Sequence, residues 1–71
     1  MPDLADRRKE ALDELTRTGI REAANRVIAA HGISGLTMSM VAEEAGLAKG
    51  TLYNYFEDKN DLIFHVLVQA F

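Results

Sequence analysis

Residues 49–56, Lys-Gly-Thr-Leu-Tyr-Asn-Tyr-Phe, hold the side chains of this chain that are best suited to contacting another molecule. If these residues form a helix, Leu52 and Phe56 share one buried stripe because they lie four positions apart. The opposite face then presents small and polar groups with a tyrosine on either side, namely Gly50, Thr51 and Asn54 flanked by Tyr53 and Tyr55. This outer face is rich in hydrogen-bond donors, and Lys49 adds a positive charge at its start.

The other reactive residue types are too sparse for catalysis. The chain has no cysteine, which excludes a thiolate metal cage and a thiol nucleophile. Its two histidines, His31 and His65, lack metal-ligand spacing, and no serine or carboxylate group joins them as a nucleophile with its base. We expect His31 near the last carbonyls of a helix and a structural role for His65. No enzyme activity, metal or cofactor is therefore predicted.

Length and composition indicate one small folded domain. The chain has 71 residues, of which 48% are hydrophobic and one is proline, so it can bury enough apolar surface to fold. No apolar run approaches the roughly 18 residues of a membrane span, and residues 1–9 lack the apolar core of a signal peptide. We expect a cytoplasmic protein without a membrane partner.

Charge is distributed unevenly along the chain, whose net charge is -3. Residues 32–71 contain five acidic side chains but only two basic ones, Lys49 and Lys59. A nucleic-acid contact in this part must use those lysines, neutral donors and helix N-termini rather than a broad basic field. Residues 7–9, Arg-Arg-Lys, are either a minor-groove arm or a solvated helix face, and neighbouring acidic residues favour the latter.

Helical periodicity predicts an all-α protein, since no β alternation is sustained. The first helix carries an inward stripe and ends at Gly32, which suits a left-handed C′ position followed by Ile33 as the apolar C″ residue. Its start is left open, because Gly19 disfavours an extension toward the leucines upstream. The stripe consists of Ile20, Ala23, Ala24, Val27 and His31, with Ile28 at its edge.

Three shorter helices are expected to follow. Thr37 is a good N-cap for residues 38–45, and Gly46 ends that helix. The second of the three spans residues 49–56. Asp58 and Asp61 resemble a capping box for the last helix, which is expected to reach Phe71. In the helix over 38–45 the inward residues are Met38, Val41, Ala42 and Ala45, and the outward ones are Ser39, Met40, Glu43 and Glu44.

Two short helices joined by a tight, glycine-containing turn form a helix-turn-helix, whose second helix enters the major groove of DNA. Across residues 17–71 the sequence resembles the TetR family of bacterial transcriptional regulators. The residues that carry the resemblance are Ile20, Ala23, Ala24, Val27, Gly32, Thr37, Val41, Ala42, Ala45, Gly46, Leu47, the run 49–56, Asp58, Lys59 and Leu62. The resemblance implies a three-helix DNA-binding bundle, preceded by an extension over residues 1–16, that leads into a fourth helix.

The resemblance also implies roles for individual residues. The implied DNA-binding set is Thr37, Ser39, Lys49, Gly50, Thr51, Tyr53, Asn54, Tyr55 and Lys59. Within it, Lys59 matches a phosphate-binding lysine, and both tyrosines match positions that touch the sugar-phosphate backbone. Outside that family context, the tyrosines would be partly buried core residues and the lysines ordinary solvated ones. Ala48 departs from the family pattern, in which serine is frequent, and cannot cap a helix.

The last helix has more apolar surface than a lone bundle needs. Leu62, Ile63, Val66 and Ala70 lie on one side, whereas Phe64, Val68 and Phe71 form a second stripe. We expect a domain or partner to cover this second stripe. In relatives this helix leads into a domain that binds a small effector and forms a homodimer on a palindromic operator. A repressor that continues beyond residue 71 is therefore expected; the alternative is a helical module that binds a protein partner through this helix.

Overall fold

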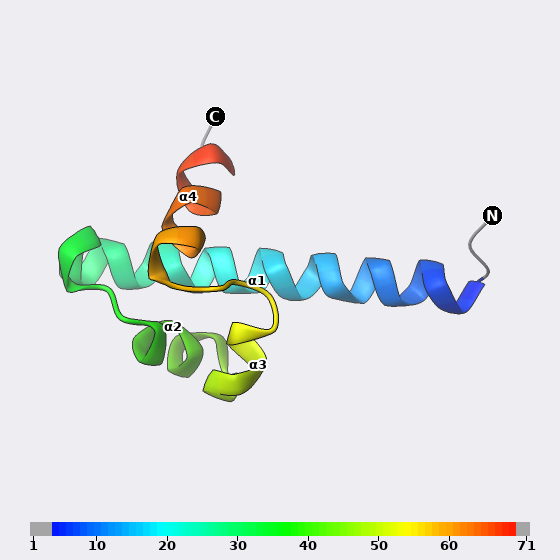
Figure 1. The fold of residues 1–71 in the computed structure, drawn as a ribbon. Coiled ribbons are helices and arrows are strands. Elements are labelled where there is room, and N and C mark those ends of the chain that lie inside the picture. The colour runs from blue at the N-terminus through cyan, green and yellow to red at the C-terminus, as the bar shows by residue number, and fades with distance from the viewer. Residues whose placement is uncertain (1–3, 70–71) are drawn as a thin grey trace.

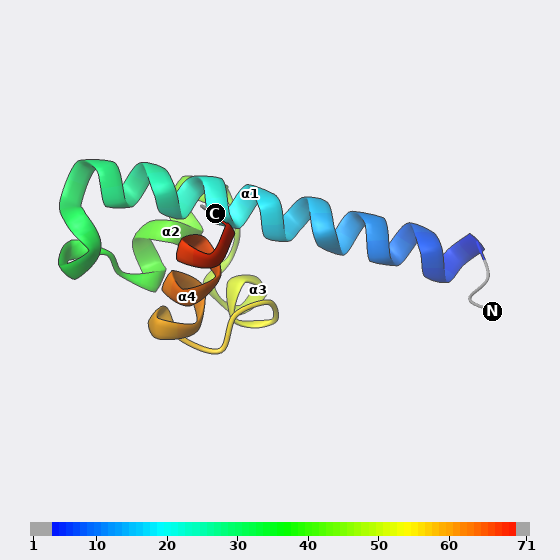
Figure 2. The ribbon, with the colours of Figure 1, turned by 90° about the horizontal axis from the view of Figure 1, so that it is seen from above.

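The computed structural model describes residues 4–69, which form four helices and no strand. They are α1 (Leu4–Gly35), α2 (Met38–Ala45), α3 (Lys49–Tyr53) and α4 (Lys59–Gln69). In Figure 1, α2 and α3 lie below α1, and α4 rises across it on the other side. The N-terminal half of α1 projects beyond the bundle, as Figure 2 also shows. The predicted all-α fold is confirmed.

One core joins all four helices. The inward stripes predicted for the helices supply most of it, and Phe56, Ile20, Leu36, Leu52, Leu62 and Val41 are its largest fully buried side chains. Burial of each large apolar side chain stabilises the fold by about 1.5–3 kcal/mol. His31, the last residue of the predicted stripe, is instead exposed, because it lies at the open end of the groove between α1 and α2.

The described part of the N-terminal extension, residues 4–16, is helical. α1 begins at Leu4 and passes through Gly19 without interruption, although Leu4, Leu12 and Leu15 are 71%, 62% and 68% exposed. Good helix formers upstream therefore outweigh the single unfavourable glycine. Ala70 and Phe71, which were expected to continue the last helix, lie outside the described residues.

Gly32 breaks α1 with φ 76° and ψ 167°. The positive φ agrees with the prediction, but this ψ is extended rather than left-handed helical, so a further turn follows before the chain leaves α1. Consequently Ile33, expected as the apolar C″ residue, is 45% exposed. Leu36 fills the core in its place.

The described part of the chain contains no helix that is both long enough and apolar enough to span a bilayer.

Replacing Gly32 by alanine is expected to lower the free energy of unfolding by about 1–3 kcal/mol, because its backbone conformation is essentially restricted to glycine. Gly19→Ala is the matched control: it lies in regular helix and should raise stability by about 0.5–1 kcal/mol. At both positions the new Cβ meets no atom within 4 Å, so only backbone preference differs. Urea denaturation measures both values; equal effects would contradict the assignment.

Candidate nucleic-acid interface

Both ends of α2 are capped. The Thr37 hydroxyl accepts a hydrogen bond from the Met40 amide at 3.1 Å, as predicted for an N-cap. At the other end Gly46 has φ 70° and donates its amide to carbonyls of the last turn, while the Leu47 amide reaches the Ala42 carbonyl at 2.9 Å. These bonds fix the direction in which the chain leaves α2 and enters α3.

α3 is shorter than predicted. The helix ends at Tyr53 instead of Phe56 and contains five residues. The following amides of Asn54 and Tyr55 bond to carbonyls three residues back, at 3.1 and 3.0 Å, which tightens the last turn. Leu52 and Phe56 are nevertheless both buried, as expected.

Most of the predicted DNA-contacting side chains are accessible. They lie at the start of α2, along α3 and in the turn after it. Tyr53 is 44% exposed, so it is not a core aromatic residue. The other exposed members of the predicted set are Thr37, Ser39, Lys49, Gly50 and Asn54, whereas Thr51, Tyr55 and Lys59 are half-buried.

Tyr55 contacts α1 through both ends of its side chain. Its hydroxyl donates a hydrogen bond to Asp13 Oδ1 at 3.2 Å, and the Arg17 guanidinium carbon lies 5.4 Å from the ring centroid. Neither Asp13 nor Arg17 was among the predicted site residues. The sequence nevertheless held a signal for them, because Asp13 and Arg17 lie on the same face of α1 as the inward residues Ile20 and Ala24.

Lys59 begins α4 beside the end of α1. Its ammonium group donates a long, 3.5 Å hydrogen bond to the Ser34 carbonyl. The start of α4 is capped by Asp58, whose carboxylate accepts from the Asp61 amide at 2.8 Å. In a capping box the Asp61 carboxylate would accept from the amide of Asp58, the cap residue itself. Here it accepts instead from the amide of Glu57, at 2.9 Å.

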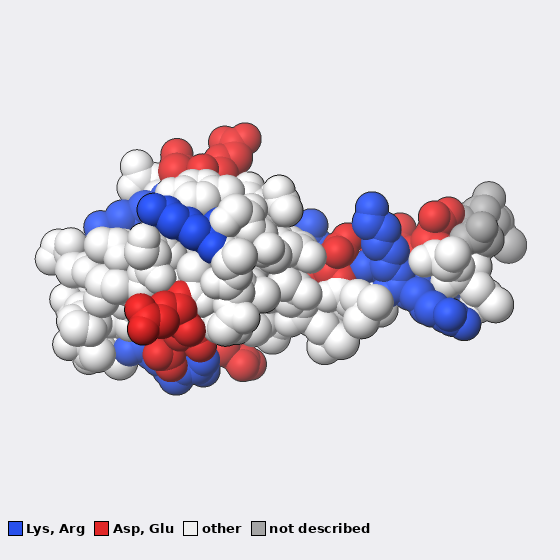
Figure 3. All heavy atoms as spheres, turned by 90° about the horizontal axis from the view of Figure 1, so that it is seen from below, with Lys and Arg blue, Asp and Glu red and all other residues white. Residues whose placement is uncertain are grey.

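The outer surface of α2 and α3, on the side away from α1, carries few charges. In Figure 3 most of this surface is uncharged; its acidic atoms gather in one compact group and another at its edge, and its basic atoms do not form a broad field. Residues 7–9 lie in the projecting part of α1 and are helical and exposed. A nucleic-acid contact on the α2–α3 face, as predicted, would therefore use mainly neutral donors and single lysines.

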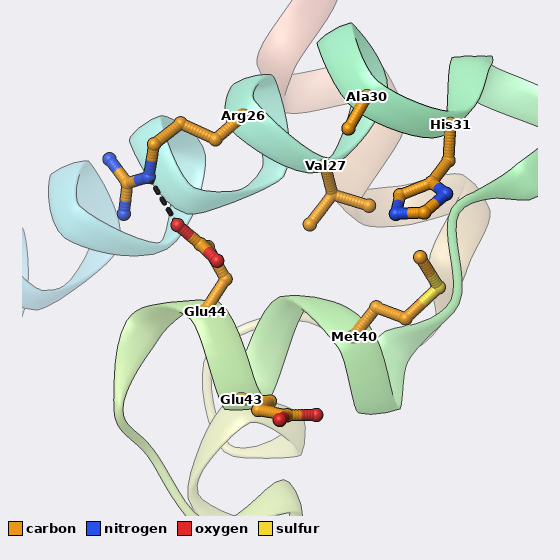
Figure 4. A pocket seen from close by; sticks show the side chains of 7 residues that line it. All are labelled: Arg26, Val27, Ala30, His31, Met40, Glu43 and Glu44. Carbon is orange, nitrogen blue, oxygen red and sulfur yellow. Dashed lines mark hydrogen bonds and ion pairs between the residues drawn. The ribbon is translucent and has the colours of Figure 1, made fainter.

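A pocket of about 410 Å³ separates α1 from α2 (Figure 4). Its side chains do not form a reactive group. Arg26 and Glu44 span it through a 2.7 Å ion pair, and Met40 and His31 lie toward its other end. Met40 was expected outside, but it is half-buried and packs against the core. Among residues 4–69, no cluster of His, Cys, Asp or Glu could hold a metal ion.

The arrangement of α2, the Gly46 turn and α3 is a helix-turn-helix. Residues 20–66 match the family model described as "Bacterial regulatory proteins, tetR family". The chain belongs to this family.

Two Staphylococcus aureus proteins illustrate the similarity. The HTH-type transcriptional regulator SAB2452 of strain bovine RF122 / ET3-1 is 38% identical over 60 residues, and the HTH-type transcriptional regulator SA2364 of strain N315 is 37% identical. Each match covers 84% of this chain and 31% of the relative, so the chain spans about a third of these proteins. No solved structure matches the chain significantly.

Loss of the Thr37 cap should destabilise α2. Thr37→Ala is expected to lower the free energy of unfolding by about 1 kcal/mol, because the Met40 amide loses its acceptor. Thr37→Ser keeps the hydroxyl and is the matched control, expected to remain close to the original chain. Chemical denaturation of the three proteins provides the measurement. An equal loss in both variants would assign the effect to the threonine methyl group instead.

Proposed function

We propose that this chain is the DNA-binding part of a transcriptional regulator and recognises a specific duplex sequence through α3. The observation that carries the proposal is the capped α2–Gly46–α3 unit, which holds a small, polar and exposed surface outside the core. Gly50 leaves the backbone of α3 open to close approach, since no atom lies within 4 Å of the position of a Cβ there. Such a surface fits the major groove, where donors and acceptors identify the bases.

We further propose that the whole regulator is a cytoplasmic homodimer that represses transcription from a palindromic operator until a small effector binds a C-terminal domain. The length of the relatives supports a further domain, because this chain covers 31% of SAB2452. α4 supports a covered surface: Phe64 is 61% exposed, and Leu67 and Val68 are each 49% exposed. Pairing two half-site contacts in a dimer raises avidity by roughly 10²- to 10⁴-fold.

The same exposed face of α4 favours one alternative. A small helical module that binds a protein partner through Phe64 and Val68 would have the same apolar stripe without any need for DNA. Phe71, which was predicted as part of this interface, lies outside the described residues. The two functions differ in whether α3 selects a DNA sequence.

Selection from random duplex DNA separates the two functions. The 71-residue chain, dimerised through an appended coiled coil, is expected to enrich one palindromic sequence. A Tyr53→Ala, Lys59→Ala double variant should capture much less duplex in each round, because it removes two proposed backbone contacts. Absence of any enriched sequence with the unchanged chain would overturn DNA recognition and leave the interaction module.

Phosphate contacts and base contacts should respond differently to substitution. Lys59→Ala is expected to weaken binding to all sequences alike and to lower the slope of log affinity against log salt by about one unit. Asn54→Ala should instead change preference at one base pair by roughly 1–3 kcal/mol and leave random DNA unaffected; Thr51→Ala is the parallel test. Fluorescence anisotropy titrations with selected and random duplexes provide both values. Equal losses on both duplexes for Asn54→Ala would contradict a base contact.

A further inference from the structure

We infer that Asp13 and Arg17 are positioning residues for DNA recognition, because they hold Tyr55 and thereby fix the turn that follows α3. The inference rests on the proposed DNA binding and assigns part of it to the N-terminal half of α1. Both residues precede the segment that matches the family model, residues 20–66.

α3 needs support from outside itself. An isolated helix shorter than about 12–15 residues is marginal in water, and α3 has five. Its N-cap residue, Ala48, provides no side-chain hydrogen bond. Leu52 and Phe56 attach the helix and its following segment to the core. The turn at residues 54–55 lies between them; its own amides bond to carbonyls of α3, and the Tyr55 side chain ties it to α1.

The Tyr55 hydroxyl is committed to α1. A phenolic hydroxyl has one proton to donate, and here that proton goes to Asp13 Oδ1 at 3.2 Å. While this bond exists, the hydroxyl cannot also donate to a DNA phosphate. The geometry therefore indicates that Tyr55 acts on DNA recognition through the placement of α3 rather than through a direct phosphate bond.

Arg17 contacts the aromatic ring of Tyr55. Its guanidinium carbon lies 5.4 Å from the ring centroid, within the range of a cation–π contact. Its ion pair with Glu14 is long, at 4.0 Å, and the two side chains are 42% and 63% exposed, so that pair constrains Arg17 weakly. Asp13 and Arg17 are one helical turn apart, which lets a single face of α1 contact the hydroxyl and the ring together.

A double-mutant cycle on DNA affinity tests the hydroxyl contact. The coiled-coil-dimerised chain is titrated with its selected duplex as Asp13→Ala, Tyr55→Phe and the double variant. Each single change is expected to raise Kd about 3- to 10-fold, because a less ordered turn must be ordered on binding. The double variant should bind no more weakly than the weaker single variant. The salt slope should stay unchanged in all three, because no phosphate contact is lost.

Three controls separate positioning from other effects. Asp13→Asn keeps a side-chain acceptor for the hydroxyl and is expected to restore Kd to within about twofold of the original chain. Glu10→Ala removes an acidic charge from the same exposed part of α1 and should not weaken binding. Far-UV circular dichroism confirms that every variant is folded at the titration temperature, so that losses in Kd are not losses of folded protein.

Arg17 is tested in the same way with Arg17→Gln. This change is expected to raise Kd about two- to fivefold in the original chain and to have no further effect when Tyr55 is leucine, which has no ring for the guanidinium. A drop of about one unit in the salt slope would instead make Arg17 a direct phosphate contact and overturn its positioning role.

The remaining outcomes are also decisive. If Tyr55→Phe weakens binding equally with and without Asp13, the hydroxyl contacts DNA directly and the inference is wrong. If Asp13→Ala tightens binding, Asp13 acts only as a repulsive charge. A chain that selects no DNA sequence overturns the proposed function and this inference together, whereas a chain that selects DNA but shows no coupling in the cycle overturns the inference alone.

Discussion

The packing of α2 and α4 on α1, and of α3 on α2, is the interaction on which the rest of the structure depends. α2, α3 and α4 contain eight, five and eleven residues, fewer than an isolated helix needs to be stable in water. Each is helical here because it buries an apolar stripe against the row formed by Ile20, Ala23, Ala24 and Val27, or against a neighbour on that row. Any displacement of α3 from this core would therefore cost its helical structure as well as its position.

Local caps determine where these helices begin and end. Thr37 and Asp58 accept amide hydrogen bonds at the starts of α2 and α4, and Gly46 ends α2 with a positive φ. The caps do not replace core burial, since each contributes about 1 kcal/mol. The caps set the direction in which the chain enters the next helix. A chain that leaves α2 at Gly46 places Leu52 of α3 against the core and the opposite face of α3 outside.

The outer face that results has little charge, which sets how it can bind DNA. Sequence-independent affinity for DNA comes mainly from cations that replace counterions along the phosphates. On the α2–α3 face such cations are few (Figure 3), so the electrostatic contribution of a single domain to DNA affinity is small. Contacts to DNA on this face would have to come from shape and neutral donors more than from charge.

Local sequence rules were sufficient for the helical class, most of the buried stripes, both caps of α2 and the side-chain cap that starts α4, because these features depend on residues within about four positions of one another. They were insufficient wherever a distant element decides the outcome. α3 ends at Tyr53 although Phe56 stays buried, and Tyr55 turns to Asp13, 42 positions earlier in the chain. Lys59 likewise meets the carbonyl of Ser34. Which partner a half-buried polar side chain finds is set by the assembled helices, and for that physical reason only the tertiary structure decided these contacts.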